Sequence, residues 1–145
     1  MKLSTKGRYA IRIMLCIGRF QNLGSVSKKK IAEQEGISTD YIEQIVTPLK
    51  NAGLVVSTRG LHGGFKLTNS ASKISLYDIL SAIEGDFNKV EVLAEGVSRA
   101  DDGVMKDIWK GAFKELVDYF SGISLKNCID NYEKLMSKEP IMFNI

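Results

Sequence analysis

The chain has 145 residues, 44% of them hydrophobic, which is enough for one folded domain with a substantial core. It shows no signal-peptide pattern and no apolar run of membrane-span length. It has two cysteines, which form no CxxC motif, and a single histidine, so a zinc site is not expected. A reducing cytoplasm is the expected compartment. The net charge is +3, but residues 1–66 hold 11 Lys and Arg against 4 Asp and Glu, while residues 67–145 hold 9 against 13; this split suits a polyanion-binding first half and a protein-binding second half, or chance clustering on the surface.

The basic half begins with two predicted helices. Apolar residues recur at three- and four-residue steps over Thr5–Phe20, which predicts a first helix with one apolar face. Ser27 is a suitable N-cap for a short second helix over Lys28–Gln34, and Gly36 can stop that helix in the left-handed conformation. A short helix followed by a glycine turn is the first part of a helix-turn-helix.

A third helix is expected from the N-cap Ser38 to the Ala52-Gly53 pair, with an apolar stripe on one side, and Pro48 should kink it or shift its last turn. Hydrogen-bonding side chains near the N-terminus of such a helix can reach base edges in the major groove of DNA, although a solvated polar face is the alternative. Gln44 suits adenine, and Glu43 can accept from the amino group of cytosine. The predicted major-groove contacts are Ser38, Thr39, Asp40, Tyr41, Glu43 and Gln44.

Two short β-prone runs, Leu54–Thr58 and Phe65–Thr68, then enclose a glycine-rich basic turn. A hairpin directly after the third helix is typical of a winged helix-turn-helix, so the predicted fold class is mainly α with a small β-hairpin wing. A basic tip can enter a narrow minor groove, whereas an ordinary solvated turn is the alternative. A phosphate-binding P-loop is a poor match because no Gly-Lys-Ser/Thr follows. The predicted minor-groove contacts are Arg59, Gly60, His62 and Gly63.

Other basic residues of the first half are candidate phosphate contacts, which fix the register of a complex and make binding salt-dependent. Three of them are lysines at the N-terminus of the second helix, where they oppose the helix dipole. That cost is easier to explain beside a phosphate, although a solvated lysine run fits equally well. The predicted phosphate contacts are Lys6, Arg8, Lys28, Lys29 and Lys30.

The first helix also carries a thiol, Cys16, between Arg12 and Arg19 at the edge of its polar side. Neighbouring cations lower the pKa of a thiol and could make it redox-responsive. The alternative is a small residue that simply packs in the core.

The acidic half is predicted to be helical as well. Ser75 and Asp78 form a capping-box pattern before a helix that ends near Glu84, a long helix follows over about Val104–Phe120, and Ser124 caps a last one. Large apolar groups on the long helix step by four, three and four residues, which is heptad spacing and indicates a core or a dimer interface. The predicted dimer contacts are Ile108, Trp109, Phe113, Leu116 and Phe120.

Three regions result from this pattern. Residues 1–84 form the winged helix-turn-helix DNA-binding domain, and residues 85–103 form a linker or effector region with a short apolar piece at Val90–Ala94. Residues 104–145 form the dimerisation helix and the C-terminal helix.

Four segments of the chain resemble the bacterial Rrf-type winged-helix regulators, a family that includes iron–sulfur and nitric-oxide sensors. These segments are MKLSTKGRYA, GIS-x-x-Y-I-E-Q, LKNAGLV and RG-x-x-GG-F. The resemblance extends over essentially the whole chain. It implies that the third helix reads the major groove through Thr39–Gln44, that Arg59 reads the minor groove, and that the long helix crosses its counterpart in a homodimer.

One departure from this family concerns its cofactor. Cluster-binding members carry three closely spaced cysteines before the dimer helix, and residues 88–106 of this chain contain none. No iron–sulfur cluster, other cofactor or metal is therefore expected. The segments VEVLAEG and IMFNI are similar to the cluster-free, CymR-type members, which implies repression of sulfur and cysteine genes with cysteine synthase as a co-repressor.

The sequence thus predicts a homodimeric repressor that binds a palindromic operator in double-stranded DNA, with no membrane contact. The protein is not expected to be an enzyme, because the sequence shows no catalytic set of a nucleophile, a base and a residue that orients the base. Two other classes stay open. One is a protein-interaction module whose DNA binding depends on a partner, and the other is a regulator that responds to a metal or to oxidation of Cys16.

Overall fold

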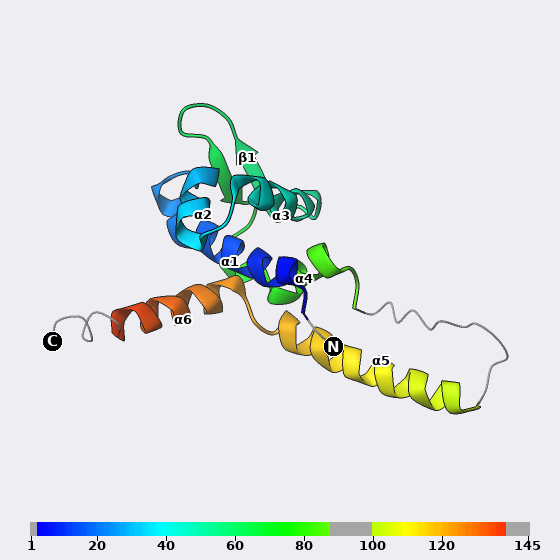
Figure 1. The fold of residues 1–145 in the computed structure, drawn as a ribbon. Helices are drawn as coiled ribbons and strands as arrows, with labels where there is room; N and C mark the ends of the chain where they lie inside the picture. Colours follow the sequence, from blue (N-terminus) through cyan, green and yellow to red (C-terminus); the bar gives the residue numbers. More distant parts are fainter. Residues whose placement is uncertain (1–2, 88–99, 139–145) are drawn as a thin grey trace.

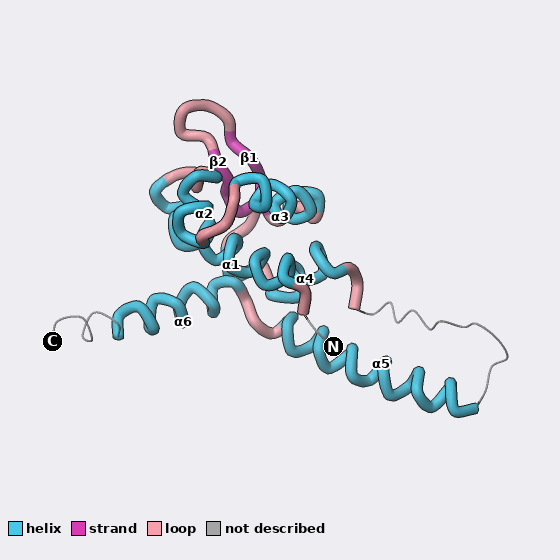
Figure 2. The backbone as a smooth tube through the Cα atoms, viewed as in Figure 1, coloured by secondary structure: helices cyan, strands magenta, loops and turns pink. Residues whose placement is uncertain are grey.

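The computed structural model describes residues 3–87 and 100–138, and it is mainly helical with one antiparallel β-hairpin, which confirms the predicted fold class (Figures 1 and 2). Its elements are α1 (Thr5–Phe20), α2 (Lys28–Glu35), α3 (Thr39–Asn51), β1 (Val55–Thr58), β2 (Gly64–Leu67), α4 (Leu76–Glu84), α5 (Ala100–Ser121) and α6 (Leu125–Lys138), with 3-10 turns at Gln21–Leu23 and Ala71–Lys73. The apolar piece Val90–Ala94 and the segment IMFNI lie outside the described residues.

Serine caps determine where four of the helices begin. The hydroxyls of Ser4, Ser27 and Ser38 accept hydrogen bonds from backbone N–H groups of the first turns of α1, α2 and α3. The predicted capping box at α4 is also present, because Asp78 N donates to Ser75 Oγ at 3.0 Å and Ser75 N donates to Asp78 Oδ2 at 2.8 Å. These local bonds explain why the N-termini of these helices were predictable from sequence.

The core lies where α1 crosses the other helices of the head, meaning α1 to α4 with the hairpin. The apolar stripe of α3 faces α1 and is fully buried, and α6 adds two side chains from the other side. The buried residues are Ala10, Ile13, Met14, Cys16, Ile17, Val26, Ile31, Ile42, Ile45, Val46, Leu49, Val55, Phe65, Ile74, Ile79, Leu80, Leu125 and Ile129. Pro48 is tolerated within α3, which continues to Asn51.

The wing, Val55–Leu67, consists of β1, β2 and the turn between them. Val55 pairs with Leu67 and Thr58 with Gly64, and Val26 forms a bridge to Phe65 on the other side of β2. Val26 N donates to Phe65 O at 2.9 Å, and Phe65 N donates to Val26 O at 2.8 Å. The base of the wing is therefore attached to the segment that leads into α2.

The long helix α5 begins at Ala100, earlier than the predicted Val104, so it includes the end of the predicted linker. Figure 1 shows α5 extending away from the packed helices on one side and α6 extending on the other, and α6 packs against α1. A firm joint connects α5 and α6 to the head, because Leu76 N donates to Ile123 O at 2.9 Å and Leu125 N donates to Ile74 O at 2.7 Å. None of the helices in residues 3–87 and 100–138 combines the length and apolar character needed to cross a membrane.

Candidate nucleic-acid interface

The polar side of α3 is open to solvent opposite its buried stripe. Four of the six predicted major-groove residues are exposed there, while Tyr41 and Glu43 are half-buried. The exposed four are Ser38, Thr39, Asp40 and Gln44. The Ser38 hydroxyl already accepts from Tyr41 N at 3.1 Å as the N-cap, which leaves it less free to read a base.

Tyr41 is positioned by α1. Its ring meets the Tyr9 ring edge-on, with centroids 5.7 Å apart and an interplanar angle of 88°. The Arg12 guanidinium lies 4.8 Å from the Tyr9 ring centroid, and its Nε donates to Glu35 Oε2 at 2.7 Å. The first turn of α3 is thus supported from behind by a stack that reaches the end of α2.

The tip of the wing carries the predicted minor-groove residues. Arg59, Gly60 and His62 are exposed and Gly63 is half-buried. Gly60 has a φ of 102°, a conformation that side-chain-bearing residues rarely adopt, and its carbonyl accepts from Gly63 N at 3.0 Å. Leu61, an apolar residue within this glycine-rich turn that the sequence analysis did not single out, is 95% exposed.

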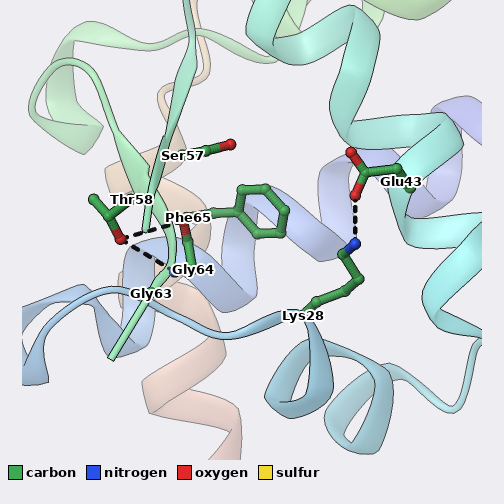
Figure 3. Close-up of a pocket in the computed structure, with 7 residues that line it drawn as sticks. All are labelled: Lys28, Glu43, Ser57, Thr58, Gly63, Gly64 and Phe65. Carbon is green, nitrogen blue, oxygen red and sulfur yellow. Dashed lines mark hydrogen bonds and ion pairs between the residues drawn. The ribbon is translucent and has the colours of Figure 1, made fainter. Parts of the chain in front are cut away.

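A cavity of about 330 Å³ lies between the wing and α3 (Figure 3). Its walls come from three separate elements: the N-terminus of α2, the polar side of α3 and the base of the wing. The lining residues are Lys28, Glu43, Ser57, Thr58, Gly63, Gly64 and Phe65. The structure therefore brings one predicted phosphate contact, one predicted base contact and one predicted wing residue to a single groove.

Two of these residues bind each other across that groove. Lys28 Nζ lies 2.7 Å from Glu43 Oε2, and both side chains keep more than a third of their surface exposed. The hydrogen bond from Lys28 lowers the pKa of the Glu43 carboxyl from its ordinary value. Neither the phosphate contact predicted for Lys28 nor the base contact predicted for Glu43 anticipated this pairing.

The other predicted phosphate contacts divide into two groups. Lys6, Arg8 and Lys29 are exposed. Lys30 is half-buried and places its ammonium 4.0 Å from the centroid of the Phe20 ring, a cation–π contact that engages it within the chain.

Of the two interpretations of Cys16, the redox interpretation requires a lowered thiol pKa, and the structure gives the opposite shift. Cys16 is fully buried, and burial raises its pKa to about 11, with Glu35 adding to the rise and Arg19 and Lys30 opposing it. The packing interpretation is the one that the structure supports. Cys128 on α6 is half-buried, and burial raises its pKa as well.

The predicted dimer helix presents an apolar surface. Of the predicted dimer residues, Ile108 is 56% and Trp109 51% exposed, and no residue of α5 is buried within the chain. Phe113, Leu116 and Phe120 are half-buried, and the Phe120 ring lies 6.4 Å from the Phe87 ring of the same chain. The end of α5 near the head is thus partly covered, and its distal part is open.

Comparison with known proteins identifies a matching family model and related sequences. Residues 3–131 match the family model "Rrf2: Iron-dependent Transcriptional regulator". The chain is 39% identical over 121 residues to the HTH-type transcriptional regulator CymR of Bacillus subtilis (strain 168), covering 81% of this chain and 84% of that protein.

Solved structures agree with this match. CymR (YrzC), the global cysteine regulator of B. subtilis, superposes with a TM-score of 0.76 at 33% identity, covering 90% of this chain and 98% of that one. T. potens IscR superposes with a TM-score of 0.76 at 32% identity, covering 93% and 90%. Both solved chains are thus similar to this one over nearly their whole length.

Proposed function

Since the chain belongs to the Rrf2 family of transcriptional regulators, which bind DNA and are not enzymes, we propose that it reads a palindromic operator as a homodimer. The observation that carries this proposal is the shared groove of α2, α3 and the wing. In a complex with duplex DNA, α3 would lie in the major groove and the wing would reach the adjacent minor groove. The strand backbone between the two grooves would then run past the N-terminus of α2.

Within that complex each predicted residue has a distinct role. Gln44 is exposed on α3 and can bind adenine, while Arg59 at the wing tip can enter a narrow minor groove. Lys6, Arg8 and Lys29 are exposed and can bind phosphates without reading sequence.

The homodimer is supported by the open distal part of α5. Val104, Met105, Ile108 and Trp109 are each 46–60% exposed there, an amount of apolar surface that a monomer rarely leaves uncovered on one helix. A second copy of α5 can cover this surface, because in a twofold-symmetric dimer the same patch of each copy contacts its counterpart. Regulators of this family are generally dimeric.

Repression of cysteine and sulfur metabolism genes is the regulatory role that we propose. The similarity to CymR, a global cysteine regulator in B. subtilis, supports it over most of the chain. Cysteine synthase is the proposed co-repressor, and the cytoplasm, where its DNA target lies, is the proposed site of action. Titration calorimetry with cysteine synthase tests the partner, and absence of binding heat at micromolar concentrations would reject it.

We also propose that this regulator works without an iron–sulfur cluster, although iron dependence is part of the family description. The cysteines do not fit a cluster: Cys16 is enclosed in the core of α1 with a raised thiol pKa, and Cys128 lies on α6. Within residues 3–87 and 100–138 no group of three His, Cys, Asp or Glu side chains could hold a metal. Anaerobic reconstitution that left stoichiometric iron on the protein would overturn this proposal.

The experiment that tests DNA reading is selection of bound duplexes from a randomised library, followed by affinity measurement on the enriched duplex. Arg59→Ala is expected to lose about 1–3 kcal/mol of binding free energy. Lys134→Ala on α6 removes the same charge from an exposed site on another element and should leave affinity within about twofold. Equal losses in the two variants would remove Arg59 from the interface, and failure to enrich any sequence would reject DNA reading itself.

A further inference from the structure

We infer that Lys28 is a positioning residue for base readout: it holds the Glu43 carboxylate in the groove between α3 and the wing and so determines which base pair Glu43 selects. This inference rests on the proposed function, because it concerns the same DNA-binding surface. It assigns Lys28 a role that differs from the phosphate contact its charge suggests.

The placement of the two side chains carries the first step. Lys28 is the first residue of α2 and Glu43 is in the second turn of α3, and their charged atoms meet at 2.7 Å on the wall of the cavity (Figure 3). Opposite them stand the wing residues Thr58 and Gly64. Thr58 Oγ1 accepts from Gly64 N at 3.1 Å, which fixes the base of the wing that faces the pair.

Electrostatics supplies the second step. Lys28, Lys29 and Lys30 lie in the first turn of α2, where the helix dipole is unfavourable to cations. The Glu43 carboxylate brings a compensating anion to this end of the helix. The pair therefore satisfies the lysine locally, without any phosphate.

The third step concerns DNA. A bare carboxylate on a DNA-facing helix would repel the phosphates, and an ion pair reduces that repulsion. Lys28 binds Oε2, and a carboxylate retains acceptor capacity on its second oxygen, Oε1. A carboxylate held in one direction can accept from the amino group of cytosine at one operator position, whereas a freely rotating one cannot discriminate as well.

Four proteins test this reasoning: the wild type, K28M, E43Q and the double variant K28M/E43Q. Each is used full-length to select duplexes from the same randomised library, and its affinity is measured by fluorescence anisotropy on the wild-type consensus duplex. K28M is expected to lose about tenfold in affinity in the wild-type background, because the unpaired Glu43 carboxylate then repels the DNA phosphates. In the E43Q background the loss should be less than about threefold. K28M should also lose the preference for cytosine at one position.

K29M is the matched control, because Lys29 is an exposed lysine on the same turn of α2. It should lower affinity by the same factor with or without E43Q, reduce the salt dependence by about one phosphate contact, and leave all base preferences unchanged. Because the Lys28–Glu43 pair is partly exposed, all variants should keep the wild-type thermal midpoint within a few degrees.

Two results separate failure of the inference from failure of the proposed function. If the wild type enriches a consensus but the effects of K28M and E43Q multiply independently, Lys28 is an ordinary phosphate contact and the inference is wrong. The same conclusion follows if K28M weakens every sequence alike, as K29M does. If the wild type enriches no sequence, the proposed function is wrong and the inference is overturned with it.

Discussion

The open surface of α5 allows the dimer to be tested by removing one side chain. Trp109 keeps 51% of its surface exposed and no residue of α5 is buried, so Trp109→Ala leaves the buried core unchanged and removes surface that a partner would cover. An aromatic side chain buries roughly 150–250 Å², and half of that is about 100 Å² per copy. At roughly 25 cal/mol per Å² this is about 2.5 kcal/mol per protomer and about 5 kcal/mol in a symmetric dimer, where the loss occurs twice.

A loss of this size raises the dimer dissociation constant by about two to four orders of magnitude, the lower figure allowing for incomplete burial of the ring. Sedimentation equilibrium over a dilution series measures the constant directly. Lys114→Ala is the matched control, because Lys114 is exposed on the same helix and loses only its ion pair with Asp118 at 3.1 Å. A Trp109→Ala protein that dimerised as tightly as the Lys114→Ala protein would show that α5 does not form the interface.

Three further substitutions test the wing, the helix α5 and the buried thiol. Gly64→Ala places a methyl group against the backbone carbonyl of Val26, so the bridge at the base of the wing should open and stability should fall by about 1–3 kcal/mol in a urea melt. Gly111→Ala is the control, because at this helical site nothing lies within 4 Å of the new methyl group, and it should raise stability by about 0.5–1 kcal/mol. Equal changes in stability for the two variants would contradict the close contact between Gly64 and Val26. Because the Cys16 pKa is raised from 9.0 to about 11, the stability that its buried thiol confers is complete below pH 9.0 and is lost as the pH rises toward about 11. Cys16→Ala should flatten that decline, and an unchanged slope would show that Cys16 does not contribute to it.

Local sequence signals were sufficient for most of the head. The caps Ser27, Ser38 and Ser75 each bond within their own first turn, so the patterns that predict them need no knowledge of the rest of the fold. Gly36 ends α2 with a φ of 66° for an equally local reason. The position of α3 and the wing followed from the same signals.

Local patterns do not predict features that depend on contacts between residues far apart in the sequence. The redox interpretation of Cys16 considered the cations on its own helix, but the desolvation that raises the thiol pKa comes from elements packed against α1. The pairing of Lys28 with Glu43 joins two helices whose relative placement no periodicity reveals.

The joint between α4, α5 and α6 has a consequence for the DNA that two copies could read. Backbone hydrogen bonds on both sides of Ser124 tie the connection between α5 and α6 to the start of α4. Ile129 of α6 packs closely on α1, because a methyl group added at Gly18 would lie 2.7 Å from Ile129 Cδ1. In a dimer joined through α5, each head would therefore be held at a set distance from the twofold axis. That distance would determine the spacing between the two halves of the operator. Their centres must lie one helical turn apart, which is about 10 base pairs, or a multiple of it. An insertion in the short connection between α5 and α6 should thus change the preferred operator spacing while leaving the recognition of each half unchanged.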